Sequence, residues 1–381
     1  MTETPTLAIS RLTLTQFRNY AELRLDMSSK LIALWGPNGA GKTNLLEAIS
    51  LLAPGRGLRG NSFDALARHG GNGTWAIAGE LETPGGKVNL GTGWDSQSGE
   101  GRSVMIDGRV QKSSGILGQH LRVLWLTPAM DRLFGGPASD RRRFLDRLVQ
   151  AFDPEHGARL TVFEKLMRER NLLLGEPRSD SAWISSLEAH MAEAAIAVAA
   201  ARLTAVESLQ RHIGQSRGLS DFPWARIAVE GGTELLVSSM PAVRAEDEYR
   251  KLLADSRRAD QAAGRTLHGP HRSDFAVWHG PKDAAATQCS TGEQKALLIG
   301  LILAQARAVK GDSGVAPVLL LDEVAAHLDR VRRESLYATL ERLGCQAWMS
   351  GTEAGLFQGL GPDAAVFHVE DASISEVTGI P

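Results

Sequence analysis

Residues 36–43 read Gly36-Pro-Asn-Gly-Ala-Gly41-Lys42-Thr43 and match the pattern G-x-x-x-x-G-K-[ST] at every position. The run before it, Leu31–Trp35, is wholly apolar, as expected of a strand buried on both faces, and an amphipathic helix follows over Thr43–Leu52. The glycines let the backbone turn its N–H groups toward a phosphate, and the helix N-terminus adds a positive dipole. A glycine-rich turn with a chance lysine would not explain this order of strand, loop and helix. The stretch therefore predicts a phosphate-binding loop in an α/β fold.

The candidate catalytic residues lie in this loop and after a second apolar run. Lys42 would reach the β- and γ-phosphates of ATP, and the hydroxyl of Thr43 would bind Mg²⁺. Asp322 ends the run Val318–Leu321 and would be the second Mg²⁺ ligand, while Glu323 would polarise the attacking water. An Asp-Glu pair alone is ordinarily a capped strand end, but its occurrence with a complete phosphate loop favours the catalytic interpretation. The other candidate nucleotide contacts in this region are Gly36, Pro37, Asn38, Gly39, Ala40, Gly41 and Asn44.

The amino-acid composition excludes several classes of protein. The chain has 381 residues, 43% of them hydrophobic and 23% charged, which is typical of a soluble globular protein with two or three packed units. Its formal net charge of −2 argues against a protein that coats nucleic acid by bulk charge, but not against local basic patches. Cys289 and Cys345 have no metal-ligand spacing, and the N-terminus lacks a signal core. No apolar run reaches the roughly 20 residues that span a bilayer. We therefore expect a cytoplasmic protein without a membrane anchor.

Hydrophobic periodicity divides the chain into an α/β part and an inserted helical part. Alternating patterns predict strands in the first third, and apolar strands and helices return after residue 265. The intervening segment predicts three main helices and two short strands: His156–Leu174, Asp180–His212 and Ala245–Ala263, with Arg226–Glu230 and Glu234–Val237. We therefore predict an ATPase lobe formed by residues 1–136 and 265–381, with a mainly helical lobe at 137–264 inserted into it.

A second candidate loop reads Ser290-Thr-Gly292-Glu293-Gln-Lys and opens a helix. Ser290 and Gly292 at this helix N-terminus would form another anion-binding edge. The spacing of Ser290 and Glu293 also fits a capping box, and the two interpretations are compatible. The loop resembles the signature loop of ABC-type ATPases, with two departures from the family form S-G-G-Q, and the stretch ending at Asp329 looks like their D-loop. In that family the signature loop closes on nucleotide held by a second copy, which implies an ATP-dependent homodimer with these residues near the nucleotide.

Three further positions compare with the same family. Thr352 stands where the family usually delivers a histidine to the γ-phosphate. Arg59 matches an arginine that related chromosome-structuring ATPases point at the phosphates. No glutamine ends the predicted strand Arg122–Leu126, where the family has its Gln loop.

Four motifs extend the resemblance over essentially the whole chain. They are Phe17-Arg-Asn-Tyr20, Asp140-Arg141-Arg142-Arg143-Phe-Leu-Asp146, Arg168-Glu-Arg-Asn171 and Gly269-Pro-His-Arg-Ser-Asp274. Together with the phosphate loop they resemble the RecF family of DNA repair ATPases. The resemblance implies an ABC-type head related to SMC heads, with a helical second lobe and no long coiled coil. It also implies a slow DNA-dependent ATPase that binds gapped or junction DNA and helps load recombinase with RecO- and RecR-type partners.

Two questions stay open at the level of sequence. Arg141, Arg142 and Arg143 could contact DNA phosphates, or they could form a solvated helix face with weak ion pairs. The chain could also be an SMC-like DNA-binding scaffold in which nucleotide is a conformational switch and turnover is incidental. A transporter subunit is disfavoured by the 248 positions between Lys42 and Ser290.

Overall fold

The computed structural model describes residues 7–98, 101–176, 180–215, 217, 218 and 220–377. The chain packs as two units, the first formed by Met1–Asp131, Ser216–Phe222 and Leu298–Pro381, the second by Arg132–Gln215 and Pro223–Leu297. The lobe division expected from the sequence stays a prediction, and the packing units differ from it at 132–136, 216–222 and 265–297. The stretch 265–297 packs with the second unit because its strand Asp274–His279 pairs with Ala225–Glu230.

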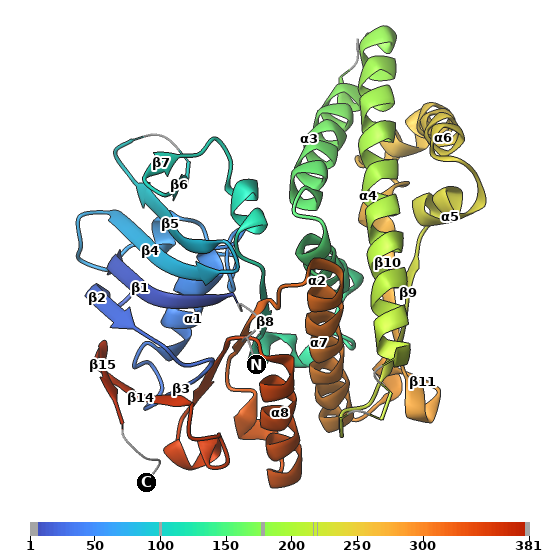
Figure 1. The fold of residues 1–381 in the computed structure, drawn as a ribbon. Helices are drawn as coiled ribbons and strands as arrows, with labels where there is room; N and C mark the ends of the chain where they lie inside the picture. Colours follow the sequence, from blue (N-terminus) through green and yellow to red (C-terminus); the bar gives the residue numbers. More distant parts are fainter. Residues whose placement is uncertain (1–6, 99–100, 177–179, 216, 219, 378–381) are drawn as a thin grey trace. The chain divides into compact units, whose positions relative to one another are not determined.

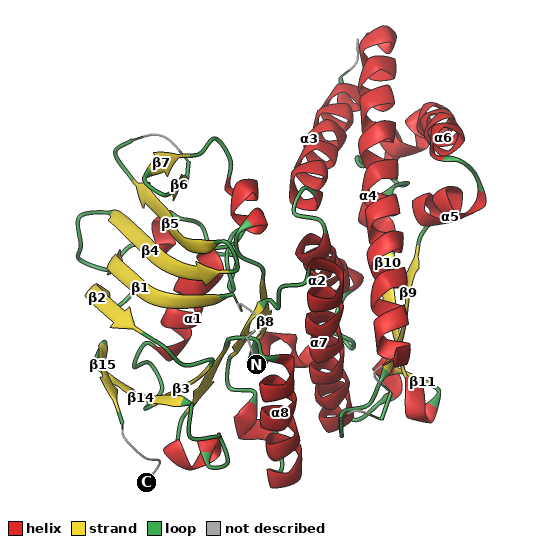
Figure 2. Ribbon diagram, viewed as in Figure 1, coloured by secondary structure: helices red, strands yellow, loops and turns green. Residues whose placement is uncertain are grey.

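The first unit contains two six-stranded sheets (Figures 1 and 2). An antiparallel sheet has the order β2-β1-β4-β5-β6-β7, and a mainly parallel sheet has the order β15-β14-β3-β13-β12-β8. The elements of this unit are β1 (Ala8–Phe17), β2 (Tyr20–Asp26), β3 (Leu31–Trp35), α1 (Lys42–Leu51), β4 (Thr74–Thr83), β5 (Gly86–Asp95), β6 (Ser103–Ile106), β7 (Arg109–Val110), β8 (Val123–Leu126), β12 (Val318–Leu321), α8 (Arg330–Leu343), β13 (Ala347–Gly351), β14 (Ala365–Glu370) and β15 (Ser373–Glu376).

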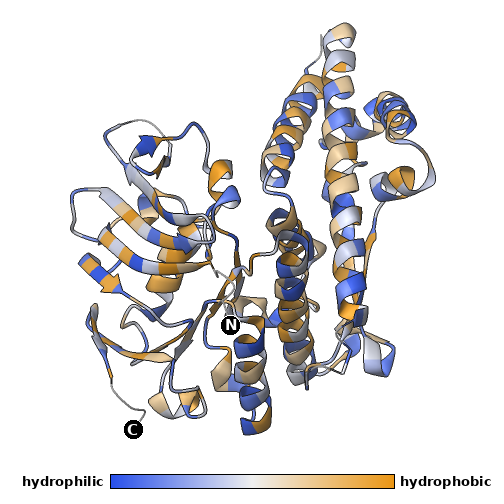
Figure 3. Cartoon of the chain, viewed as in Figure 1, coloured by the Kyte–Doolittle hydropathy of each residue, from blue (hydrophilic) through white to orange (hydrophobic). Residues whose placement is uncertain are grey.

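Helix α1 contacts both sheets, touching β1 and β4 on one side and β13 on the other. Its side chains Leu45, Leu46 and Ile49 are fully buried, so the helix that follows the phosphate loop is the centre of this core. Along β1 the buried residues alternate with half-exposed ones, and the same alternation shows as bands of opposite hydropathy on the antiparallel strands (Figure 3). The strand β3 is buried on both faces, as its unbroken apolar run predicts.

The second unit is built around the long helix α4 (Ser181–Gln215). The other elements are α2 (Ala138–Phe152), α3 (His156–Gly175), β9 (Ala225–Glu230), α5 (Gly232–Ser239), α6 (Ala242–Ala263), β10 (Asp274–His279) and β11 (Ala284–Ala285), and α7 (Thr291–Ser313) begins in this unit and ends in the first. By length and apolar composition alone α4 could cross a membrane, but most of that window is buried inside the protein, on one face that includes Met191, Ala195 and Leu209. Burial in a helical core accounts for its composition.

The prediction of a strand at Glu234–Val237 is wrong, because these residues form α5. A short apolar run does not distinguish strand from helix by periodicity. The side chain of Glu234 decides the outcome, since it is buried and bonded to Arg202 and Ser273, while Leu236 and Val237 pack on the core formed by α4 and α6.

A buried ion network holds α3, α4 and α6 together. Arg170 is fully buried and binds the carboxylates of Glu188 and Asp260 at 2.9 and 2.7 Å. Its remaining donors reach the Thr266 hydroxyl at 3.1 Å and the Leu253 carbonyl at 2.8 Å. Leaving any of these guanidinium N–H groups unpaired in the core would cost folding free energy.

Replacing Arg170 by alanine should therefore destabilise the second unit strongly, because Asp260 stays buried without its cation and Glu188 keeps only its pair with Arg257. We expect a loss of about 3–5 kcal/mol in the free energy of unfolding. Urea unfolding followed by circular dichroism measures it, with Arg250→Ala as control, since Arg250 is exposed and pairs with Asp247 on its own helix. Equal unfolding midpoints for the two variants would show that the network contributes no more than a surface pair.

Candidate functional site

The phosphate loop joins β3 to α1 and uses three glycines in conformations that other residues rarely adopt. Gly36, Gly39 and Gly41 have φ angles of 149°, 82° and 119°. A Cβ at Gly36 would lie 2.0 Å from the Val369 carbonyl oxygen, and one at Gly41 would lie 2.5 Å from the Tyr20 hydroxyl. A Cβ at Gly39 would meet nothing within 4 Å. The loop is thus backed by protein at both ends and open at its middle, which is the shape of a cradle.

Lys42 places a buried cation inside this loop. Its side chain is 4% exposed, and its ammonium donates hydrogen bonds to the carbonyls of Gly36 and Pro37 at 2.6 and 2.8 Å. Burial lowers the pKa of Lys42, while the nearby carboxylates of Glu323 and Asp322 oppose that shift. A loop that already turns a cation and a helix N-terminus toward one space fits an anionic phosphate.

Asp322 connects the end of β12 to the start of α1. The Thr43 hydroxyl donates to Asp322 Oδ1 at 2.9 Å, and the Ser350 hydroxyl donates to the same oxygen at 2.7 Å. The backbone N–H of Glu323 donates to Ser350 Oγ at 2.9 Å, and Glu323 itself adopts a positive φ of 54°. Because β12 and β13 are adjacent parallel strands, Ser350 on β13 reaches the Asp-Glu pair at the end of β12. Sequence reasoning missed Ser350, since nothing in its own neighbourhood marks it.

The pair formed by Thr43 and Asp322 fits a magnesium ion. Mg²⁺ takes oxygen ligands and is usually held by one or two carboxylates together with substrate phosphates and water. A hydroxyl and a carboxylate that lie 2.9 Å apart beside a phosphate cradle supply that donor set. Among the described residues no cluster of three or more His, Cys, Asp or Glu side chains could hold a metal by itself.

The turn between β1 and β2 supports the cradle from behind. Asn19 Nδ2 donates to the Ala40 carbonyl at 3.0 Å, and Asn44 Nδ2 donates to Asn19 Oδ1 at 2.8 Å. Tyr20 lies directly beneath Gly41. The sequence showed Phe17–Tyr20 only as a family motif, and the contacts show that this turn positions the loop.

A buried carboxylate fixes the arginine expected near the phosphates. Glu47 on α1 is fully buried and accepts from Arg18 at 2.7 and 2.9 Å. Arg59 donates to the same carboxylate at 2.9 Å and to Asn44 Oδ1 at 2.8 Å. Arg59 is thereby held beside the first turn of α1. Glu47 was not a sequence candidate, because an acidic residue within an amphipathic helix ordinarily faces solvent.

Two predicted site residues of the first unit lie at element ends. Thr352 is exposed and directly follows β13, whose last pair, Gly351 with Trp35, lies at the strand end that carries the phosphate loop. Asp329 caps α8 by accepting a hydrogen bond from the Arg332 N–H at 2.9 Å. Its capping role does not depend on nucleotide.

The predicted signature loop opens α7 in the second unit with a reciprocal capping box. The Ser290 N–H donates to Glu293 Oε2 at 3.0 Å, and the Glu293 N–H donates to Ser290 Oγ at 3.4 Å. Lys282 pairs with Glu293, and this hydrogen bond, with that from the Ser290 N–H, lowers the pKa of Glu293 to about 2. Ser290 and Gly292 stay exposed at the helix N-terminus. The structure thus has the capping box that the spacing of Ser290 and Glu293 predicted, and the role of this loop as an anion-binding edge stays a prediction.

The arginines predicted to contact DNA are largely engaged within the second unit. Arg141 forms a two-pronged ion pair with Asp274 at 2.8 and 2.7 Å, and Arg143 pairs with Asp140. Arg142 donates to the Ser273 carbonyl at 2.8 Å. The three arginines are thus not equivalent, and Arg141 is occupied by a structural contact.

A large cavity of the first unit does not coincide with the phosphate loop. It has a volume of about 960 Å³ and is lined by residues that precede β3, β13 and β14, among them Lys30, Cys345 and Ala364. Parallel sheets bind ligands at the carboxyl ends of their strands, and this cavity lies at the opposite ends. The candidate nucleotide site is therefore the cradle at residues 36–43, which lies at the carboxyl end of β3.

The sequence matches known families over nearly its full length. The family model described as RecF/RecN/SMC N terminal domain matches residues 8–374. The chain is 52% identical to the DNA replication and repair protein RecF of Mesorhizobium japonicum, over 96% of this chain and 97% of that protein. It is 49% identical to the protein of the same name from Rhizobium leguminosarum bv. trifolii, over 97% and 99% of the two chains.

Solved structures agree in fold. The recombination mediator protein RecF, solved as RecF-ATPrS in the RecFOR pathway, has a TM-score of 0.86 at 21% identity, covering 98% of this chain and 99% of that one. The Smc head domain of Pyrococcus furiosus has a TM-score of 0.54 at 16% identity, with 98% and 96% covered. The predicted fold class, an ABC-type head related to SMC heads, is confirmed by these likenesses.

Alanine substitutions should distinguish Gly36, which lies against the protein behind the loop, from Gly39, which faces open space. Gly36→Ala would drive a Cβ into the Val369 backbone, whereas Gly39→Ala meets only the strain of a positive φ, of about 1–2 kcal/mol. We expect Gly36→Ala to lower the thermal unfolding midpoint clearly more than Gly39→Ala. Differential scanning calorimetry makes the comparison, and the reverse order would contradict the contact of β14 with the loop.

Proposed function

Because the chain belongs to the RecF family, we propose that it is a DNA-binding ATPase that dimerises on ATP and acts in recombinational repair. The observation that carries this proposal is the hydrogen bond between Thr43 and Asp322, which joins the phosphate loop to the acidic strand end. Strand ends of β3, β12 and β13 meet at one edge of the parallel sheet and hold a cation, a hydroxyl and two carboxylates. This set of groups is the one that nucleotide hydrolysis requires.

The residues of the cradle would bind the nucleotide together. Backbone N–H groups of residues 36–41 would surround the phosphates, and Lys42 would exchange its loop carbonyls for the β- and γ-phosphate oxygens. Thr43 and Asp322 would hold Mg²⁺, which neutralises phosphate charge when bound. Asn44, held by Asn19, keeps Arg59 oriented toward the same turn of α1.

Glu323 would act on the attacking water. Its backbone is fixed by the hydrogen bond to Ser350, which also orients Asp322, so the two carboxylates keep a constant relation. A carboxylate in this position accepts a hydrogen bond from water and the proton that the water loses. Thr352 offers a hydroxyl where related ATPases carry an imidazole, and this favours slow turnover and a switch-like use of ATP.

A second copy of the chain would complete the site. Each cradle is open at Gly39, and each α7 presents an exposed N-terminus at Ser290 and Gly292. Exposed N–H groups at a helix start attract phosphate oxygens, so the α7 terminus of one copy suits the nucleotide held by the other. Glu293 caps this helix, and Asp329 would lie near the nucleotide through its place in the D-loop.

We further propose that the dimer binds gapped DNA or single-strand/double-strand junctions in the cytoplasm. In this role it helps RecO- and RecR-type partners to load recombinase, and DNA stimulates its hydrolysis. The net charge of −2 suits a protein that binds DNA through local patches and later releases it.

The Glu323→Gln variant tests whether turnover is catalysed. Glutamine keeps the shape of the side chain but accepts no proton, so DNA-stimulated phosphate release should fall by at least about a hundredfold. Binding of a fluorescent ATP analogue should persist, and Glu353→Gln, an exposed position after β13, serves as control. Unchanged phosphate release in Glu323→Gln would mean that another group activates water, and would favour incidental turnover.

The Ser290→Arg variant tests the two-copy site. A bulky cation at the α7 N-terminus should block dimerisation with ATP while leaving nucleotide binding in the first unit intact. Sedimentation velocity with ATP should then show monomers, whereas Ser290→Thr, which keeps the capping hydroxyl, should dimerise as the natural protein does. A normal ATP-dependent dimer of Ser290→Arg would refute the shared site.

A further inference from the structure

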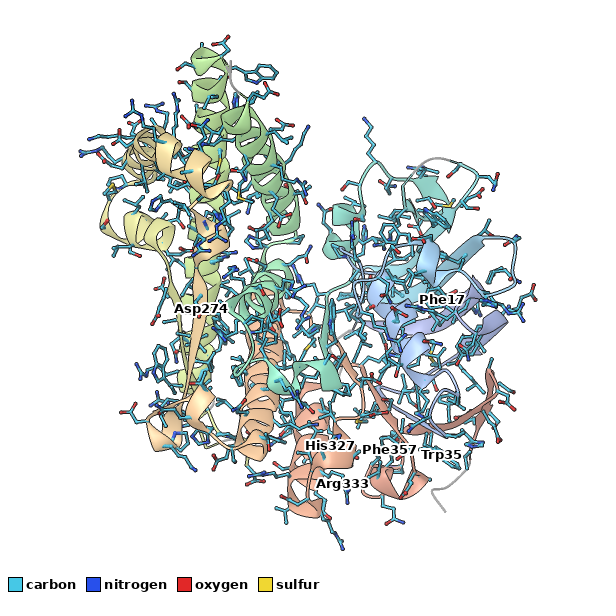
Figure 4. The ribbon with its side chains drawn as sticks, turned by 180° about the vertical axis from the view of Figure 1, so that it is seen from behind. Phe17, Trp35, Asp274, His327, Arg333 and Phe357 are labelled. Carbon is cyan, nitrogen blue, oxygen red and sulfur yellow. The ribbon has the colours of Figure 1, made fainter. Side chains whose placement is uncertain are left out.

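Two motifs that are far apart in the sequence interlock in the second unit. Arg141 on α2 grips Asp274 at the start of β10 through both carboxylate oxygens, at 2.8 and 2.7 Å (Asp274 is labelled in Figure 4). Asp146, one turn further along α2, receives Arg202 of α4 at 2.8 and 2.9 Å, and Arg202 also donates to the Pro270 carbonyl at 2.7 Å. The segments 140–146 and 269–274 therefore form one structural element, which we name the arginine lock.

The buried side chains of the arginine lock are bonded to other groups of the protein. Glu234 receives Arg202 at 3.3 Å and the Ser273 hydroxyl at 2.6 Å, and both carboxylate and hydroxyl are buried. His271 bonds to the Thr266 carbonyl at 3.0 Å and stacks on Phe163. Burial lowers the pKa of His271, which disfavours the charged form of its imidazole. His271 therefore has a structural role in the motif, because it anchors the turn.

When each carboxylate of the arginine lock is matched with the arginine that it binds, two arginines of the lock are left without a carboxylate. Asp274 is matched by Arg141, and Asp140 by Arg143. The carboxylates of Asp146 and Glu234 are both matched by Arg202.

Arg142 and Arg272 have no carboxylate partner in the part of the chain that the structure describes. Arg142 donates only to the Ser273 carbonyl, at 2.8 Å. Arg272 is exposed, and no hydrogen bond or ion pair to a described residue engages its guanidinium.

Arg142 lies near Arg272, because its guanidinium donates to the carbonyl of Ser273, the next residue along the chain. The pKa of Arg142 is lowered first by burial and then by the positive charge of Arg202, with a further contribution from Arg272, while the carboxylates of Asp274 and Asp146 oppose that shift. The pKa of His271, lowered first by burial, is lowered further by Arg272 and Arg142. Since neither guanidinium forms a direct ion pair with a carboxylate among the described residues, a bound anion would give each of them a charge-assisted hydrogen bond.

The backbone that carries Arg272 is fixed before any ligand binds. Residues Pro270–Arg272 form a single 3₁₀ turn, closed by a hydrogen bond from the Arg272 N–H to the Gly269 carbonyl at 2.9 Å. Gly269 has a φ of 141°, and a Cβ there would meet the Tyr249 hydroxyl at 2.5 Å, so the turn requires glycine. Because this turn is already rigid, little backbone entropy is lost when Arg272 binds a ligand with a fixed row of charges.

We propose that Arg142 and Arg272 form a contact site for the backbone phosphates of DNA on the second unit. This inference rests on the proposed DNA binding and replaces the cluster Arg141–Arg143 as its location. A phosphodiester suits the site, because each guanidinium can donate charge-assisted hydrogen bonds to phosphate oxygens. None of the large hydrophobic side chains that are exposed among the described residues belongs to the arginine lock.

The test measures binding of a fluorescein-labelled gapped duplex by anisotropy, with ATP and at several salt concentrations. Each phosphate contact contributes about 0.9 to the slope of log affinity against log salt on duplex DNA. Arg272→Gln should lower this slope by about 0.9 and weaken binding roughly tenfold at fixed salt. The double variant R142Q/R272Q should lower the slope by about 1.8.

Arg250→Gln is the matched control, since it removes one exposed arginine of the same unit that pairs with Asp247. It should bind DNA as the natural protein does. Arg272→Gln should keep the thermal unfolding midpoint and the ATP hydrolysis measured without DNA, because no contact to a described side chain is lost at Arg272. The double variant also loses the hydrogen bond from Arg142 to the Ser273 carbonyl, so its unfolding midpoint is measured beside its DNA binding.

The outcomes separate the two proposals. If the natural protein binds no DNA with ATP, the proposed function fails. If it binds DNA and both arginine variants keep its affinity and salt slope, the contact site is wrong while DNA binding stands. An equal loss in Arg250→Gln would show that overall charge, and not this site, governs binding, and would overturn the inference as well.

Discussion

The hydrogen bond between Thr43 and Asp322 spans 279 positions of sequence and fixes the geometry of the site. It is possible only because β3 and β12 lie in one parallel sheet, each next to β13, so that the start of α1 and the end of β12 face each other. Ser350 on the intervening strand adds the second hydrogen bond to the same carboxylate oxygen. The strand β13 therefore contributes to the site as well as to the sheet. Its Ser350 orients Asp322, which would hold a metal ion, and Glu323, which would activate water.

The antiparallel sheet of the same unit has a comparable role for the phosphate loop. A glycine loop with three positive φ angles has no internal reason to keep one shape, and its conformational entropy is high. Asn19 and Tyr20 restrict it from behind, and the Val369 backbone restricts it at the other end. The pair of the buried Glu47 with Arg18 holds the first turns of α1 against the same β1–β2 turn, and Arg59 pairs with Glu47 from the segment after α1. The two sheets thus meet at the loop, and neither alone would hold it open.

The sequence predicted what depends on local pattern. The phosphate loop, the strand before it and the acidic pair at 322 and 323 follow from glycine spacing and apolar runs, and nearly all the long helices were placed within a few residues. What failed depends on partners far along the chain. The run Glu234–Val237 was assigned to a strand because its apolar residues carry no information about Arg202, the buried group that Glu234 meets in a helix. Ser350 and Glu47 were missed for the same reason, since their importance lies in side chains that arrive from other strands and turns.

The arginines of the second unit show why charge has to be counted by contact and not by sequence. A run of three arginines in α2 looks like one basic patch, yet Arg141 is consumed by an ion pair inside the lock and Arg143 by a neighbour on its own helix. Burying Arg170 and Arg202 with carboxylates costs desolvation, which only near-complete pairing offsets, so these cations are unavailable to any ligand. Charge that remains free must then sit where the fold leaves a guanidinium exposed on a rigid support, as the Gly269–Arg272 turn does. A chain with a net charge of −2 can in this way present a strong local field to a phosphate, because its carboxylates are committed elsewhere.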